Sequence, residues 1–141
     1  MSQEKDLSTI EKVLFLKSID LFGQAAIEDL GRVAALTEEV RFKSGETIFR
    51  EGEFVDAIYF VAKGRVAVER NRNRIREVGA KEAFAIVAAL DQEPAVHTVI
   101  ALEPVHALKL NAEDFHDILS VDYELVRAVF RALCWMIREN Q

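Results

Sequence analysis

The spacing of hydrophobic positions changes twice along the chain. From Leu7 to Leu36 apolar residues recur every three or four positions, which predicts helices. Ser8 and Glu11 have the spacing of a capping box, which would begin the first helix. A second helix is predicted from Ala25 to Leu36.

Between residues 39 and 110 the hydrophobic period shortens to about two, which is typical of strands with one buried face. The segments EVRFK, RIREV, HTVIAL and VHALKL predict short strands. The longer segment AIYFVAKGRVAVER predicts two strands that turn at Lys63 and Gly64. Many short strands at close intervals predict a sandwich, barrel or jelly roll.

The last part of the chain returns to helical spacing. Asn111 is the expected N-cap of a helix over the segment AEDFHDIL. A long helix is predicted from Asp122 to Asn140, a segment without proline or glycine. The pattern therefore predicts a single α+β domain over residues 1–141, with a helical lead-in at 1–37, a β roll at 38–110 and C-terminal helices at 111–141.

Composition narrows the classes of function. Half of the 141 residues are hydrophobic, which predicts a packed domain. The formal net charge of −6 disfavours nucleic-acid binding by this chain alone, because such binding needs a cationic surface. The polar start MSQEKDLST is unlike a secretory signal, and the apolar run AFAIVAAL is far shorter than the ~20 residues of a membrane helix. We expect a cytoplasmic protein that makes no membrane contact.

Residues that could support catalysis or metal binding are sparse. Cys134 is the sole cysteine, so the chain can form no internal disulfide and has no cysteine pair for zinc. The histidines are dispersed at His97, His106 and His116. Glu113 and His116 form one i, i+3 pair, which favours a surface feature over a metal site. No P-loop, dinucleotide fingerprint or nucleophile motif occurs, so we expect no cofactor and no enzymatic activity.

A run of alternating arginines, RNRNRIR, falls on a predicted hairpin. Because alternate residues of a strand share a face, the arginines could form a cationic strip for an acidic or phosphorylated partner. The simpler interpretation is a charged edge that prevents pairing with other strands. The four residues are Arg70, Arg72, Arg74 and Arg76.

The segment SGETIFREGEFVDAIYFVAKGRVAV carries a specific order of glycines, acids and apolar positions. It resembles the first half of a cyclic nucleotide-binding domain, the module of catabolite-activator-type regulators, cyclic-nucleotide-dependent kinases and gated channels. The resemblance extends over residues 10 to 137 and implies an antiparallel β jelly roll (a double-stranded β-helix) with N-terminal helices and a long C-terminal helix. The matching positions are Gly45, Ile48, Glu51, Gly52, Asp56, Tyr59, Val61, Gly64 and Val66. The three glycines stand where reversing chains often need a positive φ.

In the resembled family the nucleotide sits on the pattern Phe-Gly-Glu-Leu-Ala-Leu-Leu, followed after a few residues by Pro-Arg-x-Ala-Thr. The stretch GAKEAFAIVAALDQEPAVHT, residues 79–98, aligns with this pattern on its proline and final threonine. The matching positions that it retains are Phe84, Ala88, Leu90, Pro94 and Thr98.

The stretch departs from the family where polar groups of the ligand would be held. Ala85 matches a glycine, Ile86 the glutamate that takes the ribose hydroxyl, and Ala95 the phosphate-binding arginine. His97 replaces a small residue, and Lys81 replaces another common glycine. Losing the charged bond to phosphate costs about 1.5–3 kcal/mol and losing the ribose acceptor about 1 kcal/mol more. These losses would weaken a micromolar site to about millimolar.

We therefore expect a degenerate pocket, filled by side chains, that has lost ordinary cAMP or cGMP binding. Its residues would be Phe84, Ala85, Ile86, Ala95, Val96, His97 and Thr98. The leading interpretation is a non-catalytic regulatory or protein-interaction module. One alternative is a small-molecule sensor whose modified pocket uses His97, Thr98 and Lys81. Another is the sensory part of a transcription regulator, which the lack of a DNA-binding segment disfavours.

The predicted C-terminal helix has more apolar surface than it can bury by packing one face on the β roll. One stripe can pack on the β roll, and packing within the chain alone is the simpler interpretation. We expect instead that the remaining surface forms a homodimer or docks onto another domain. The expected interface consists of Val126, Val129, Phe130, Leu133, Trp135, Met136 and Ile137.

Overall fold

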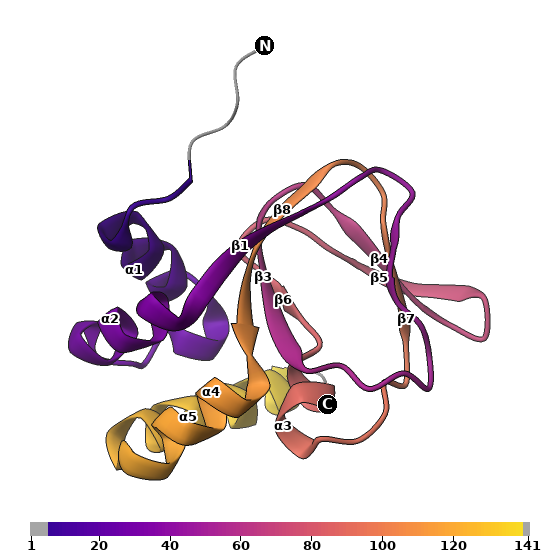
Figure 1. Ribbon diagram of the computed structural model, residues 1–141. Coiled ribbons are helices and arrows are strands. Elements are labelled where there is room, and N and C mark those ends of the chain that lie inside the picture. The colour runs from indigo at the N-terminus through magenta and orange to yellow at the C-terminus, as the bar shows by residue number, and fades with distance from the viewer. Residues whose placement is uncertain (1–5, 140–141) are drawn as a thin grey trace.

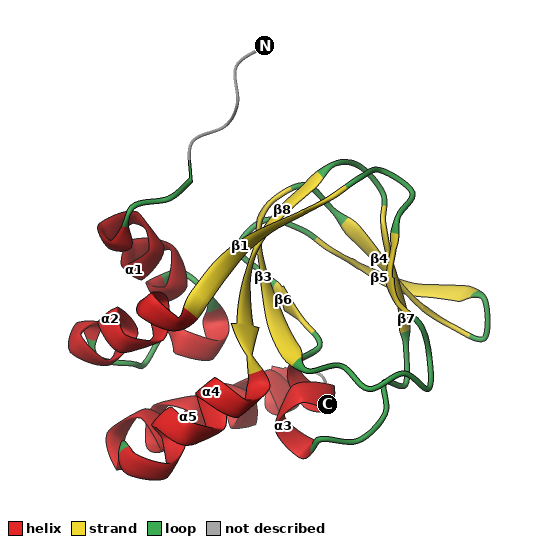
Figure 2. Ribbon diagram, viewed as in Figure 1, coloured by secondary structure: helices red, strands yellow, loops and turns green. Residues whose placement is uncertain are grey.

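The computed structural model describes residues 6–139, so the predicted helix end at Asn140 lies outside the described residues. Two four-stranded antiparallel sheets form a β roll, and the helices gather at one end of it (Figures 1 and 2). The first sheet has the order β1-β8-β3-β6, with β1 Thr37–Phe42, β8 Val105–Asn111, β3 Ala57–Lys63 and β6 Ala83–Phe84. The second has the order β2-β7-β4-β5, with β2 Thr47–Phe49, β7 Thr98–Ala101, β4 Val66–Arg70 and β5 Asn73–Val78. The predicted α+β jelly roll with flanking helices is confirmed.

Two of the helices, α1 and α4, begin at side-chain caps. In α1, Thr9–Lys17, the predicted capping box is present: the Glu11 amide donates to Ser8 Oγ at 3.1 Å and the Ser8 amide to Glu11 Oε1 at 2.9 Å. In α4, Ala112–Val121, Asn111 Oδ1 accepts from two backbone amides, as predicted. The other helices are the 3₁₀ turn η1 at Asp20–Phe22, α2 at Ile27–Leu36, α3 at Ile86–Asp91 and α5 at Tyr123–Glu139.

Aromatic contacts join the helices to the roll. The Phe22 ring lies 5.5 Å from the Phe60 ring of β3 and 5.9 Å from the Phe115 ring of α4. These rings belong to a helical core that also includes Leu125 and Val129 of α5. A second core fills the roll, where the Tyr59 and Phe84 rings stack 4.9 Å apart. The helical core, which includes residues of β3 and β8, holds α5 against the first sheet.

Three glycines make the reversals that the family pattern predicts. Gly45, Gly52 and Gly64 have φ angles of +85°, +87° and +96°. Gly64 also lies close to the loop before β8, because a Cβ there would stand 2.4 Å from the carbonyl oxygen of Pro104. A side chain at this position would displace backbone.

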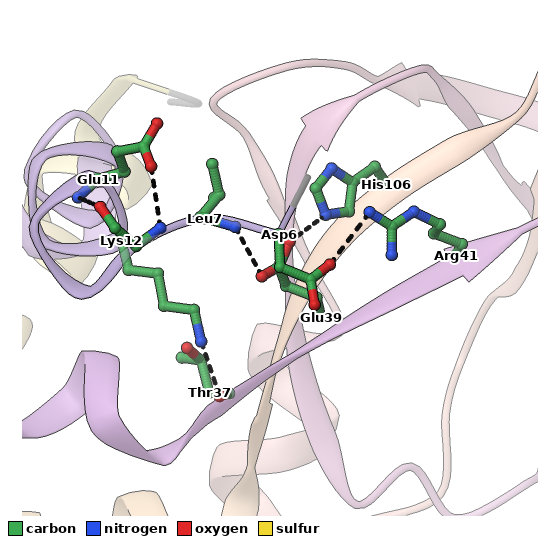
Figure 3. Close-up of polar contacts among 9 residues, drawn as sticks. Asp6, Leu7, Glu11, Lys12, Thr37, Glu39, Arg41 and His106 are labelled. Atoms are coloured by element: carbon green, nitrogen blue, oxygen red, sulfur yellow. Dashed lines mark hydrogen bonds and ion pairs between the residues drawn. The ribbon is translucent and has the colours of Figure 1, made fainter. Parts of the chain in front are cut away.

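Polar contacts join the N-terminal segment to the first sheet (Figure 3). Glu39 Oε1 lies 2.6 Å from His106 Nε2, and Glu39 Oε2 accepts from the Leu7 amide at 2.8 Å. Lys12 Nζ donates to the Thr37 carbonyl at 3.3 Å. These contacts join Leu7 and α1 to β1.

Candidate functional site

A pocket of about 750 Å³ opens between the β roll and α5. The roll contributes Phe49 and Phe84, α3 contributes Ile86, and α5 contributes Leu133 and Met136. The expectation of a pocket filled by side chains is wrong. Ile86, expected to occupy the space, packs against the helical core and lines a cavity that remains.

The structure brings together most of the predicted pocket residues. Those that line the cavity are Phe84, Ala85, Ile86, Ala95, Val96 and His97. Thr98 is not among the lining residues, and its Oγ1 accepts a hydrogen bond from the Glu51 amide at 3.0 Å. The Thr98 hydroxyl therefore ties β7 to the loop before β3.

Two positions that hold glycine in the family keep the backbone shape of glycine here. Ala85, the N-cap of α3, has φ 69° and ψ 19°, and Lys81 has φ 69°. A residue with a Cβ is strained in this left-handed region by about 1–2 kcal/mol. The Lys81 amide donates to the Val61 carbonyl at 2.8 Å. Lys81 is exposed to solvent and is not among the residues that line the pocket. Lys81 therefore shapes the turn before α3.

The position that matches the phosphate-binding arginine carries only a methyl group. Ala95 is 5% exposed, and its amide donates to the Glu53 carbonyl at 2.8 Å. Its own carbonyl accepts from the Gly52 amide at 2.7 Å. This pair of backbone bonds fixes the segment against the loop before β3, and it holds the Ala95 methyl group at the position where the resemblance implies a cation.

His97 is a half-buried residue of the pocket wall. Burial lowers its pKa below the ordinary value of 6.5, and the neighbouring Arg76 and Arg70 lower it further, while Glu51 acts in the opposite direction. The imidazole is therefore neutral at pH 7. The low pKa disfavours a charged His97 in the pocket without a ligand.

Arg76 also lines the pocket, although the sequence pattern did not place it there. It lies on β5 opposite Val68 of β4, and both residues line the cavity. Residues two positions apart in a strand share a face, and Val78 of β5 is buried. This spacing places Arg76 on the same inner face as Val78. The neighbouring Arg74 instead forms an ion pair with Glu77, at 3.2 Å. Arg76 is thus distinct from the hairpin edge with which it was grouped.

The hairpin tip accounts for the other arginines of the run. Arg72 lies in the turn between β4 and β5 with φ 67°, and Arg70 is paired with Asn73 at the strand ends. A register shift in this ladder falls between Val68 and Glu69. The alternation expected from the sequence is therefore interrupted.

The apolar residues of α5 lie in different environments. Val129, expected in the interface, is 3% exposed and packs within the chain, so a partner cannot reach it. Leu133, Met136 and Ile137 line the pocket. Exposed apolar side chains are present on the same helix at Phe130 and Trp135. The helix therefore closes one side of the cavity and presents an apolar surface to solvent.

Within residues 6–139, no cluster of three or more His, Cys, Asp or Glu side chains is arranged to hold a metal ion. None of the helices in this range is long and apolar enough to cross a membrane. Among the described residues that line the pocket, four have polar side chains: Arg76, Asp91, Glu93 and His97.

Known proteins resemble the chain in both sequence and structure. A family profile described as Cyclic nucleotide-binding domain matches residues 39–122. A protein of Rhodopseudomonas palustris, provisionally named a potassium channel protein, is 25% identical over 114 residues. The match covers 79% of this chain and 28% of that protein, so the chain spans less than a third of this relative.

Two solved structures share the fold over nearly their whole length. The N-terminal domain of a transcriptional regulator from Streptomyces coelicolor A3(2) is 29% identical with a TM-score of 0.79, and the match covers 90% of this chain and 94% of that domain. The sensor domain of the transcriptional regulator DNR from Pseudomonas aeruginosa is 20% identical with a TM-score of 0.78, over 94% and 92% of the two chains. The second likeness shows the fold alone.

Proposed function

Because the chain belongs to the cyclic nucleotide-binding domain family, we propose that it is a non-catalytic regulatory module that no longer recognises cAMP or cGMP. The observation that carries the proposal is the apolar replacement of two ligand-binding positions. Ala95 stands where the resemblance implies the phosphate-binding arginine, and Ile86 where it implies the ribose-binding glutamate. Both line the pocket, so neither ligand group meets its expected partner there.

The energetic argument follows from what a cyclic phosphate needs. A buried phosphate requires charge-assisted donors, and each lost bond of this kind costs about 1.5–3 kcal/mol. Lys81 does not line the pocket and His97 is neutral at pH 7, so neither replaces the arginine. The combined loss corresponds to an affinity about a thousandfold below a micromolar site.

The regulatory role is supported by the relatives and by the position of α5. The Streptomyces coelicolor domain belongs to a transcriptional regulator. In this chain α5 both lines the pocket and exposes Phe130 and Trp135. We propose that this exposed surface contacts a second copy of the chain or another domain. The cytoplasmic location expected from the sequence is part of the same proposal.

Calorimetric titration with cAMP and cGMP tests the loss of recognition. The natural chain is expected to bind neither at concentrations up to about 1 mM. The double variant Ile86→Glu, Ala95→Arg returns both ligand groups and is expected to gain at least about a hundredfold in affinity. A matched variant, Ile86→Gln with Ala95→Gln, adds polar side chains without charge and should gain much less. Micromolar binding by the natural chain would refute the proposal.

A further inference from the structure

Among the described residues that line the pocket, Arg76 is the one permanently charged cation, and the proposed function gives it no role. The guanidinium of an arginine is protonated at every physiological pH. Arg65 and Arg74, by contrast, are both paired with Glu77, at 2.9 and 3.2 Å. Within the part of the chain that the structure describes, Arg76 has no such hydrogen bond or ion pair. Its charge is therefore available at the pocket wall.

Hydrophobic groups make up most of the wall around this cation. Phe49, Val68 and Val99 line the roll side, and Leu133, Met136 and Ile137 line the helix side. At about 750 Å³ the cavity falls within the range of roughly 300–1,000 Å³ that small-molecule sites occupy. Such a wall stabilises a hydrocarbon body by removing its surface from water, and it offers few partners to a sugar or a nucleobase.

The positive and negative side chains that line the pocket come from different secondary-structure elements. Arg76 comes from a strand, whereas Asp91 and Glu93 come from the end of α3 and the loop after it. Asp91 Oδ1 accepts from the Glu93 amide at 3.0 Å, and this bond holds the Asp91 carboxylate beside the loop. The strand side therefore attracts a negative group and the loop side does not.

We propose that the pocket binds a small hydrophobic carboxylate, with its hydrocarbon body between the roll and α5 and its carboxylate at Arg76. The inference deepens the proposed function and rests on it, because it names the ligand class of a pocket that has lost nucleotide recognition. Three residues of α5 line the cavity, so an occupant touches the helix whose outer surface is exposed. Occupation of the pocket can thereby bias the position of α5.

The test compares three probes of equal chain length: decanoate, 1-decanol and decylammonium. Titration followed by amide chemical shifts should show saturable decanoate binding, centred on Ala95 and Met136. The affinity for decanoate should exceed that for the alcohol and the ammonium by about tenfold, the worth of one charge-assisted bond at a partly exposed site. Arg76→Gln should remove this preference and weaken decanoate binding about tenfold.

Arg74→Gln provides the matched control, since it removes the same charge from the same strand but from a residue paired with Glu77. Its decanoate affinity should equal that of the natural chain. The amide spectrum reports whether each variant is folded. Absence of saturable decanoate binding, equal binding of decylammonium, or full affinity in Arg76→Gln would each overturn the inference. Micromolar cAMP binding would instead refute the proposed function, so the two failures are distinguishable.

Discussion

Glu39 and His106 form a nearly buried pair across β1 and β8, with Oε1 and Nε2 2.6 Å apart and side-chain exposures of 6% and 9%. The two residues are diagonal neighbours in the ladder, because His106 pairs directly with Arg41. The second carboxylate oxygen of Glu39 accepts from the Leu7 amide. One side chain thus joins the N-terminal segment, β1 and β8 (Figure 3).

Replacing only one member of this pair should be costly. Glu39→Leu leaves His106 and the Leu7 amide without their acceptor, and we expect the free energy of unfolding to fall by about 3 kcal/mol. The double variant Glu39→Leu, His106→Leu should recover part of the loss, because both polar partners are then absent. Urea denaturation measures each value.

A nearby ion pair provides the control for this experiment. Glu38 lies 3.8 Å from Lys109, and its side chain is 69% exposed. Glu38→Gln should change stability by less than about 1 kcal/mol, as is usual for surface pairs. An equal loss for Glu38→Gln and Glu39→Leu would contradict a special role for the buried pair.

Ala85, the strained residue at the start of α3, predicts a substitution that raises stability. Ala85 has φ 69°, a conformation that glycine adopts without strain. Ala85→Gly should raise the free energy of unfolding by about 1 kcal/mol. Ala88→Gly, inside the same helix, should lower it by about 1 kcal/mol. Thermal denaturation of the two variants should therefore shift in opposite directions, and a shared direction would disprove the strain.

The lowered pKa of His97 predicts a pH dependence of stability. Burial is its largest cause, followed by Arg76 and Arg70. Below pH 6.5 the unfolded chain binds a proton at His97 that the folded chain does not, so this residue makes stability fall as the pH falls from that value towards the folded pKa. His97→Gln should make the stability curve flatter over this range, as urea denaturation at several pH values would show.

The contribution of Arg76 to that pKa can be measured directly. Arg76→Gln should raise the pKa of His97 towards its ordinary value, because one of the neighbouring positive charges is removed. Titration of the imidazole proton resonances reports the shift. Arg74→Gln is the control, since Arg74 is paired with Glu77. Equal shifts in the two variants would show that Arg76 has no specific effect on His97.

The exposed surface of α5 predicts self-association. Phe130 is 64% exposed and Trp135 is 52% exposed, on a helix whose other face packs within the chain. We expect sedimentation to show a dimer that Phe130→Asp converts to a monomer without unfolding it. Arg131→Asp, at a neighbouring exposed position, controls for added negative charge. A monomeric natural chain at all concentrations would contradict the dimer and leave docking onto another domain.

Local patterns predicted much of the fold, because their physics acts over a few residues. The capping box of Ser8 and Glu11 and the Asn111 cap each depend on side chains within three positions of their partners. The resemblance to cyclic nucleotide-binding domains is confirmed by the family profile over residues 39–122. The start of α2 was placed too early, since Ala25 is buried beside the helix and Ile27 is its first residue.

The state of the pocket depended on long-range packing. Replacing a polar residue by Ile86 indicated a filled cavity, but Ile86 packs against a helical core assembled from distant segments and lines a cavity that remains. Arg76 could not be separated from its three neighbours without knowing which strand residues face inwards and where the ladder is irregular.

The sequence by itself determined the jelly-roll family, the caps and turns, and the absence of an arginine and a glutamate from the aligned nucleotide positions, because each follows from residue identity and short spacing. Tertiary structure alone decided that a cavity of about 750 Å³ persists, that α5 lines it, and that Arg76 contributes to its wall. These features arise from contacts between segments far apart along the chain, and the free space that such packing leaves is not encoded in any single stretch.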